Sequence, residues 1–340
     1  MPALRRRGLF SASLVSAGLV SASLVLALGR AALAQAPSGT GLEFPSRPLR
    51  LVAGFPPGSA ADLAARLVAP GMSAALGQTV VVENRPGAGS NIAAEGVARA
   101  APDGYAILFG SVANTINASL QRDLSFDFVR DFAPVAPLVT VPNLLVVHPS
   151  VEARTVGALI TLAREKPGGL FFGSSGVGTA PHLSGEMLNL MAGIRMTHVP
   201  YPGSAQAVTD LLAGRVSVMF SPASTVLAAV REGRLRALAS TGAARTAAAP
   251  DLPTMEEAGL PGFESAVWFG LYVPAATPPP VIARLVDAAR TAMAAPATQA
   301  QLAAQGFDLL EGGPDALGRL TAAETAKWAR VVEASGARAN

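Results

Sequence analysis

The sequence predicts an α/β protein in which mainly parallel sheets are flanked by helices, and three observations lead to this fold class. Short apolar or β-branched runs alternate along the chain with Ala- and Leu-rich helical stretches, the order expected of βαβ units. The apolar runs are continuous rather than alternating, as in strands that are covered on both faces. Hydrophobic residues make up 50% of the chain and charged residues 14%, a composition that excludes intrinsic disorder.

The first half of the chain opens with an apolar run that ends in Pro56-Pro57-Gly58. The next stretch has helical spacing at Leu63, Leu67, Met72 and Leu76 and stops at Gly77. The expected strands of this half are 49–55, 79–83 and 105–110, and the expected helices are 62–76 and 91–99. The Pro-rich stretch 133–142 is interpreted as an interruption of the regular elements.

The second half repeats the alternation. The expected strands are 143–147, 170–173, 196–200, 216–220, 235–240 and 263–274, and the expected helices are 156–165, 182–191, 205–213, 223–232, 281–294, 298–305 and 315–334. Residues 241–262 are expected to be loop-rich. The interruptions near residues 140 and 263 suggest a chain that crosses twice between two lobes. We therefore expect 45–140 and 263–340 to form lobe 1 and 141–262 to form lobe 2.

The N-terminal segment 1–36 has the features of a secretory signal peptide. Arg5-Arg6-Arg7 precedes the apolar run Leu9–Leu28, and two A-x-A sequences place cleavage near residues 34–36. An uncleaved anchor is the alternative, and the pattern does not decide between general secretion and twin-arginine export. Apolar runs after residue 40 are short and broken, so no further membrane span is expected. The mature protein is expected in the periplasm.

Charge and composition exclude several functions. The 26 basic residues include four arginines in residues 1–36, where no acid lies, so 22 basic and 23 acidic residues remain. This neutral body lacks the basic face that nucleic-acid binding needs. With no cysteine and three histidines, we expect no disulfide, no lipid attachment and no metal or other cofactor. The protein is expected to be a monomer.

No catalytic constellation is complete. The sequence has no G-x-S-x-G elbow and no H-E-x-x-H motif, and its two lysines leave few candidates for Schiff-base chemistry. A Ser–His pair from Ser174 or Ser175 and His182 has no evident third partner. We therefore expect no catalytic residues, and a secreted hydrolase is the least favoured class.

Candidate binding residues lie where strands end and helices begin. Ligands of α/β sheets bind at the carboxyl ends of the strands, and helix N-termini favour anions. The loop after the first strand contains Ser59 and Asp62, which have the spacing of a capping box, so a cap alone is the simpler interpretation. The loop 83–90 lacks the full G-x-G-x-x-G pattern and is expected to be a structural turn.

Three later loops have the same placement. Loop 173–182 is rich in Ser, Gly and Thr, and we expect Ser174, Ser175 and Thr179 to hold a carboxylate with the neighbouring amides. His182 has either a structural role or a ligand contact. Tyr201 in the loop 198–204 offers a ring and a hydroxyl. Ser221 is expected to cap the helix that begins at Pro222.

Together these loops resemble a known family. GFPPGSAADLAAR, VVVENRPGAGSNIAAEGVARAAPDGYAILFGS, FGSSGVGTAPHLSGEML, HVPYPGSAQAVTDLLAGRVSVMF and GRLRALASTG are similar to the Bug family, the receptors of tripartite tricarboxylate transporters, in order over residues 45–335. The resemblance implies a two-lobed type II periplasmic-binding fold. It also implies capture of a small carboxylate in the interlobe cleft, partly through water, and delivery to a membrane permease. A sensor that presents the carboxylate to a signalling protein is the alternative.

The resemblance also indicates ligand-binding positions. With Ser221 from the strand-end argument, the candidate ligand-binding residues are Phe55, Pro57, Gly58, Ser59, Asp62, Ser174, Ser175, Gly178, Thr179, His182, Tyr201, Gly203, Ala205 and Ser221. Three positions depart from the family pattern. Ser59 replaces a glycine and adds a hydroxyl, Pro202 replaces a frequent lysine, and Ser217 stands where an aspartate is frequent.

Overall fold

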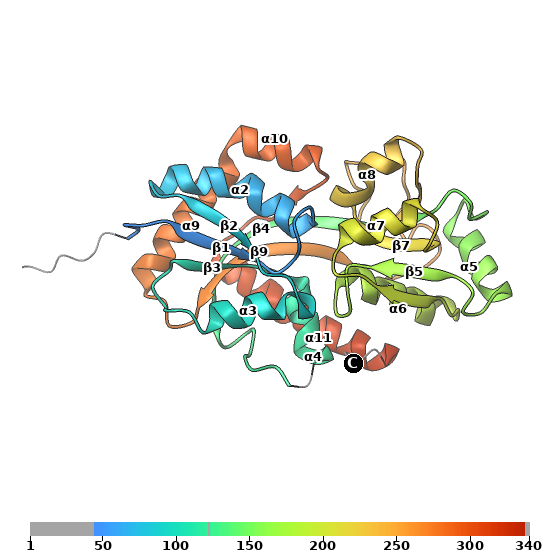
Figure 1. Cartoon of the computed structure of the whole chain (residues 1–340), viewed down its shortest axis with the longest axis horizontal. Helices are drawn as coiled ribbons and strands as arrows, with labels where there is room; N and C mark the ends of the chain where they lie inside the picture. Colours follow the sequence, from blue (N-terminus) through green and yellow to red (C-terminus); the bar gives the residue numbers. More distant parts are fainter. Residues whose placement is uncertain (1–43, 122, 337–340) are drawn as a thin grey trace, which may run out of the picture. The chain divides into compact units, whose positions relative to one another are not determined.

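The computed structural model describes residues 44–121 and 123–336. The predicted signal peptide 1–36 lies outside these residues. The α/β fold class is confirmed: the strands form one connected path in the order β2-β1-β3-β9-β4-β7-β5-β6, with helices packed against it (Figure 1). Among the helices that the structure describes, none combines the length and the hydrophobicity that a membrane crossing requires.

The first group of strands is built around β1 (Leu49–Ala53). It pairs in parallel with β2 (Val80–Asn84) and with β3 (Ala106–Ser111). Antiparallel pairing then adds β9 (Ala266–Pro274) beside β3 and β4 (Phe132–Val147) beside β9. The helices of this group are α2 (Ala60–Leu76), the short η1 (Ala88–Ser90), α3 (Asn91–Ala98) and α4 (Val112–Leu120), with α9 (Pro279–Ala294), α10 (Pro296–Ala304) and α11 (Pro314–Ser335) from the C-terminal part.

The second group of strands also combines parallel and antiparallel pairing. β5 (Phe171–Ser174) pairs in parallel with β6 (Thr197–Pro200) and β7 (Val218–Pro222), and β7 and β8 (Arg236–Ser240) pair antiparallel with the end of β4. Its helices are α5 (Val156–Glu165), α6 (Ala180–Ala192), α7 (Ser204–Leu212) and α8 (Ala223–Arg231). A separate cluster of buried apolar side chains, which includes Phe172, Leu188 and Phe220, lies within residues 145–263 and forms the core of this group.

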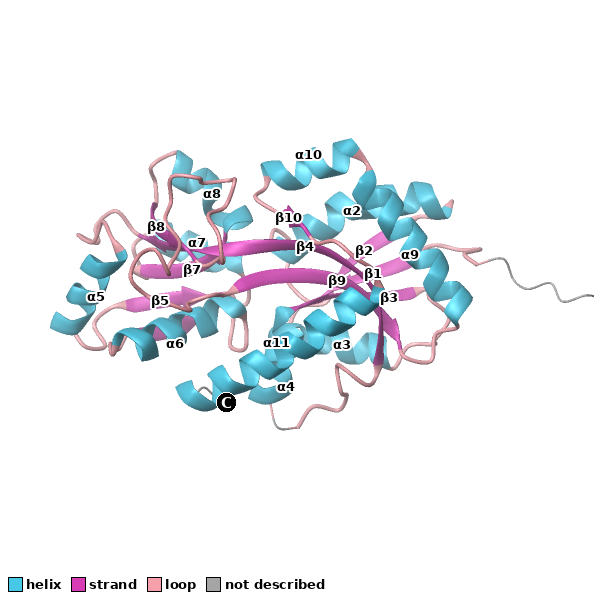
Figure 2. Cartoon of the chain, turned by 180° about the vertical axis from the view of Figure 1, so that it is seen from behind, coloured by secondary structure: helices cyan, strands magenta, loops and turns pink. Residues whose placement is uncertain are grey.

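The Pro-rich stretch 133–142 is not an interruption, which corrects the sequence interpretation. It forms most of the sixteen-residue strand β4, which lies beside β9 in Figures 1 and 2 and continues into the second group. The register shifts between Pro134 and Ala136 and between Pro137 and Val139. Such bulges accommodate proline, which has no N–H to donate to the ladder.

Most helices begin and end where the sequence places them, with two corrections. α2 begins after Ser59, whose hydroxyl accepts a hydrogen bond from the Asp62 N–H, and ends at Gly77, whose φ is 70°.

α4 was not expected. Ser221 is not a helix cap: it lies in β7, the N-cap of α8 is Pro222, and the Ser221 hydroxyl bonds to Thr225 Oγ1 at 2.7 Å. A proline cannot itself cap with a side chain, so this helix starts without a side-chain cap.

Candidate functional site

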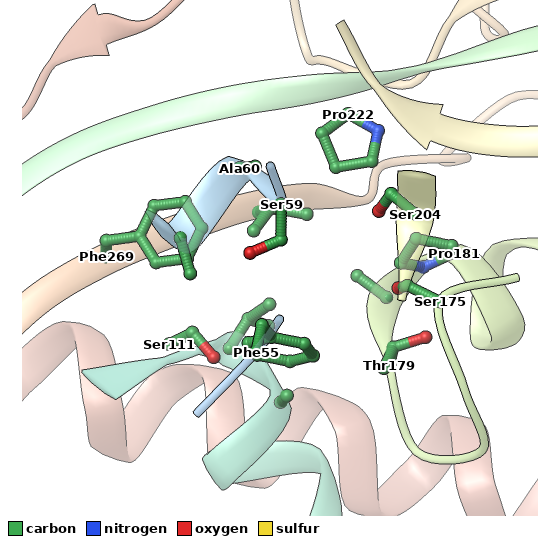
Figure 3. Close-up of a pocket in the computed structure, with 15 residues that line it drawn as sticks. Phe55, Ser59, Ala60, Ser111, Ser175, Thr179, Pro181, Ser204, Pro222 and Phe269 are labelled. Carbon is green, nitrogen blue, oxygen red and sulfur yellow. The ribbon is translucent and has the colours of Figure 1, made fainter. Parts of the chain in front are cut away.

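Five of the described helices begin around one small cavity. Figure 3 shows the side chains that line it. α2 and α4 start beside it from the first group of strands, and α6, α7 and α8 start beside it from the second. The volume of this cavity is about 30 Å³, which is below the range of small-molecule sites. The lining residues are Phe55, Ser59, Ala60, Ala61, Ser111, Val112, Ala113, Ser175, Thr179, Ala180, Pro181, Ser204, Pro222, Val267 and Phe269.

The polar side chains of the cavity are all hydroxyls, and among the described residues that line it none carries a charge. Ser59 accepts a hydrogen bond from the Asp62 N–H at 3.3 Å, so its own proton is free to be donated. Ser175 and Ser204 have no hydrogen-bond partner among the described residues. Thr179 already donates to the Gly176 carbonyl at 2.7 Å and can therefore only accept. The site thus offers hydroxyl donors together with the free N–H groups of five first helical turns.

Asp62 holds the loop that carries Phe55 and Ser59. Its nearly buried carboxylate accepts hydrogen bonds from the Gly58 N–H at 2.9 Å and from Arg66 Nε at 2.8 Å. It also accepts from Asn84 Nδ2 at 2.9 Å, and the same amide nitrogen donates to the Phe55 carbonyl. The carboxylate therefore faces into the protein and shapes the loop rather than facing the cavity.

Two stacked histidines, the buried His182 and the half-buried His198, support the loop 173–182. Ser174 is fully buried, and its Oγ lies 2.6 Å from Nε2 of His198. The His198 ring stacks on His182 at 4.1 Å between centroids and on Phe172 at 4.8 Å. Burial lowers the pKa of His182 to about 4, and burial together with the neighbouring His182 lowers the pKa of His198 to about 3. Both rings are therefore neutral at pH 7.

A wider groove adjoins the cavity and shares Phe55 and Ser175 with it. Tyr201 lines this groove, but its hydroxyl already donates to Asp210 Oδ2 at 2.8 Å. Burial and this bond to the carboxylate raise the pKa of Tyr201, and Arg215 pairs with the same carboxylate. The ring is therefore the part of Tyr201 that is open to the groove.

A third pocket, which we call the small pocket, lies beside Ser59 and Ser204, and Pro57, Gly203 and Ala205 also line it. Gly203 approaches Pro56 so closely that a Cβ at this position would lie 3.0 Å from the proline Cγ. The two loops, one from each group of strands, thus meet at a glycine next to the cavity.

The structure sorts the fourteen predicted ligand-binding residues by position. Phe55, Ser59, Ser175 and Thr179 line the cavity, Tyr201 lines the groove, and Pro57, Gly203 and Ala205 line the small pocket. Gly58, Asp62, Ser174, Gly178, His182 and Ser221 line none of the three and support the loops instead. Of the departures from the family pattern, Pro202 lines the groove and Ser217 does not line these pockets.

Eleven of the fifteen residues that line the cavity were not predicted, among them Ser111, Ser204, Val267 and Phe269. Ser111 ends β3 and is the N-cap of α4, so the strand-end rule applies to it as well. Ser204 was within the loop 198–204 and is the first residue of α7. Val267 and Phe269 come from the first half of β9, and no sequence signal marks them. Within residues 44–121 and 123–336, no group of three or more His, Asp or Glu could hold a metal ion.

Comparison with known proteins gives a consistent result. Residues 64–337 match the model of the tripartite tricarboxylate transporter family receptor. The chain is 35% identical to protein BugT of Bordetella pertussis over 87% of this chain and 91% of that protein. It resembles the solved structure of R. palustris Rpa4515 with adipate, with a TM-score of 0.83, 36% identity and coverage of 86% and 99% of the two chains.

A second solved structure, MatC of Rhodopseudomonas palustris with bound malate, has a TM-score of 0.81, 31% identity and coverage of 85% of this chain and 100% of that one. The two-lobed periplasmic-binding fold is therefore shared. Since the family model spans most of the residues that the structure describes, this chain belongs to the tripartite tricarboxylate transporter receptor family, which includes the Bug proteins.

Proposed function

We propose that this protein is an extracytoplasmic receptor that holds a small organic carboxylate in the cavity between the N-termini of α2, α4, α6, α7 and α8. The observation that carries the proposal is the convergence of five helix N-termini on a cavity without charged side chains. Each N-terminus behaves as about +0.5 elementary charge and presents unpaired N–H groups. A carboxylate is thus stabilised without a lysine or arginine.

The side chains also provide donors for an anion. Ser59 from α2 and Ser175 and Ser204 from the second group each have a hydroxyl proton to donate. A hydrogen bond to a charged acceptor contributes roughly 1.5–3 kcal/mol. Because these donors come from both groups of strands, ligand binding favours the closed arrangement of the two lobes. The relatives solved with adipate and with malate support a carboxylate as the ligand.

We propose binding without catalysis. Ser174 and His198 have the distance of a nucleophile and its base, but Ser174 is fully buried and does not line the cavity. A histidine with a pKa of about 3 is also a weak base at neutral pH. Ser175, the neighbouring serine whose side chain does line the cavity, has no base beside it among the described residues.

The partner and the cell location follow from the family and remain part of the proposal. We propose that the monomer is exported by a signal peptide in residues 1–36, works in the periplasm and delivers its ligand to the membrane permease of a tripartite tricarboxylate transporter. Lobe 1 would comprise 45–140 and 263–340, and lobe 2 would comprise 141–262. The mass of the exported protein tests cleavage near residues 34–36, and its hydrodynamic radius tests the monomer.

The binding claim is tested by calorimetric titration and thermal melting of the mature protein with four- to six-carbon mono- and dicarboxylates and their amides. We expect the carboxylates to raise the melting temperature and the amides to have little effect, because helix N-termini discriminate by charge. Equal stabilisation by the amides, or binding that survives unchanged in Ser175→Ala, would contradict a carboxylate site in this cavity.

A further inference from the structure

One side of the cavity is apolar. Val112 and Ala113 of α4 and Val267 and Phe269 of β9 form this side, which we call the apolar wall. Figure 3 shows Phe269 on one side of the cavity, with Ser175, Thr179 and Ser204 on the opposite side. The hydroxyls of the second group and the apolar wall therefore face different parts of a bound molecule.

The apolar wall is rigid. Phe269 is 1% exposed and stacks on Phe109 at 5.2 Å between ring centroids, with Phe307 at 6.5 Å on an edge. Val267 lies two residues earlier on the same face of the strand. Rotation of these side chains away from a ligand would open a gap in the core, which close-packed interiors resist.

The apolar wall also has little hydrogen-bonding capacity. Phe269 lies between two strands, opposite Ser111 of β3 and Val139 of β4, so its backbone belongs to ladders on both sides. Ser111 bears a hydroxyl and lies opposite Phe269, but it is the N-cap of α4, where a carboxylate oxygen would compete with a ligand hydroxyl for it. A ligand hydroxyl that faces Val267 or Phe269 would lose its hydrogen bonds to water without replacement.

We propose that the apolar wall makes this receptor selective for carboxylates with an unsubstituted hydrocarbon body over the same acids carrying a hydroxyl on that body, and that Val267 is a specificity-determining residue. The inference rests on the proposed function, because it assumes that a carboxylate occupies the cavity. It goes further by assigning the selection of the ligand's middle part to β9 rather than to the loops.

The test compares matched pairs of acids by calorimetric titration of the mature protein: succinate with malate, and glutarate with 2-hydroxyglutarate. We expect the unsubstituted acid of each pair to bind about tenfold or more tightly, the size of effect that an unpaired hydroxyl produces in an apolar pocket. Equal or tighter binding of the hydroxylated acids would overturn the inference and leave the proposed function standing. Absence of binding by all four acids and by the wider panel of carboxylates would overturn both.

Two variants test whether the apolar wall causes this selectivity. Val267→Thr keeps the side-chain shape and adds a hydroxyl to the apolar wall, and Ala113→Ser adds one from α4. We expect each to narrow the ratio of affinities within a pair by at least threefold. Val273→Thr is the matched control, because Val273 is buried in the same strand and does not line the cavity. If Val267→Thr and Ala113→Ser both keep the ratio of the parent protein, the apolar wall does not set specificity.

Discussion

His198 and Ser174 are joined by a 2.6 Å hydrogen bond between Nε2 and Oγ, directly behind the loop that contributes Ser175 and Thr179 to the cavity. The imidazole ring of His198 also stacks on His182, whose Nδ1 accepts a hydrogen bond from the Gly178 N–H at 3.4 Å. The loop geometry therefore depends on two neutral, stacked histidines.

Stability should rise with pH between about 5 and 7. Burial lowers the folded-state pKa of His182 to about 4 and of His198 to about 3, below the ordinary value of 6.5. The unfolded chain therefore binds more protons in this interval, so the contribution of the neutral pair is complete above pH 6.5 and is lost as the pH falls towards 4. Chemical unfolding at a series of pH values measures the slope.

The contribution of Glu186 to the pH dependence of stability must be separated from that of the two histidines. Its Oε1 lies 3.8 Å from His182 Nε2, and burial raises its pKa, which acts on stability in the opposite direction. We expect His198→Gln to flatten the slope and Glu186→Gln to steepen it. A free energy of unfolding that does not change between pH 5 and 7 in the parent protein would show that the histidines are not held neutral.

Ser175→Ala should weaken carboxylate binding by about tenfold or more. The Ser175 hydroxyl has no other partner among the described residues, and a hydrogen bond to a charged group contributes roughly 1.5–3 kcal/mol, where ~1.4 kcal/mol is a factor of ten. The melting temperature should barely change. Ser174→Ala is the contrasting variant: it leaves His198 without its partner and should lower the melting temperature. Normal affinity in Ser175→Ala would contradict a carboxylate site in this cavity.

Gly178→Ala should reduce both affinity and stability. The φ of Gly178 is 77°, and a Cβ there would collide with Oδ1 of Asn117, a residue of α4 that also donates to the Gly89 carbonyl. Gly193→Ala is the matched control, because its φ is 61° and nothing lies within 4 Å of the added carbon. That control should lose only about 1–2 kcal/mol of stability and keep its affinity.

The collision at Gly178 has its own test. In the double variant Gly178→Ala/Asn117→Ala, the side chain that collides with the new Cβ is absent. Part of the ligand affinity lost in Gly178→Ala should therefore return, while the loss of stability caused by the positive φ of residue 178 remains. Calorimetric titration of the two single variants and the double variant measures the coupling. Strictly additive losses would mean that Asn117 does not limit the position of this loop.

Asp62→Ala should cost about 2–3 kcal/mol of stability and also weaken binding. The nearly buried carboxylate accepts hydrogen bonds from the Gly58 N–H, Arg66 and Asn84, and its removal leaves these donors unpaired beside the loop that carries Ser59. Asp287→Ala removes an exposed partner of Arg290 and should change stability by less than about 1 kcal/mol. Similar losses in the two variants would contradict the role of Asp62 in shaping the loop.

The local parts of the site could be predicted from the sequence because they follow one rule. Ser59 and Ser175 were found at strand ends that precede visible helices. Ser111 follows the same rule but was missed, because α4 (Val112–Leu120) begins without an intervening loop and its Asn and Thr residues hide the helical pattern. We expected Ser174 and Thr179 to help hold a carboxylate, but the sequence could not reveal that their hydroxyls also bond to His198 and to the Gly176 carbonyl, which reach them only in the folded chain.

The non-local parts could not be predicted. Residues 133–142 contain three prolines, which normally exclude a central strand, and only the bulges opposite β9 make β4 possible. β9 lies more than 120 residues away along the chain, so no local pattern could reveal this pairing or bring Val267 and Phe269 beside Ser111. Long-range packing of this kind overrides local propensity.

The position of β9 between β3 and β4 also determines when the chain can fold during its synthesis. Until residues 266–274 have been made, β3 has an open edge whose backbone groups find no partner in the first half of the chain. The packing of α11 against α4 requires still later residues. The nascent polypeptide therefore remains incompletely folded until nearly all of it has been synthesised. During this time the unpaired edge of β3 is prone to aggregation, and the chain also remains available to any step that requires an unfolded substrate.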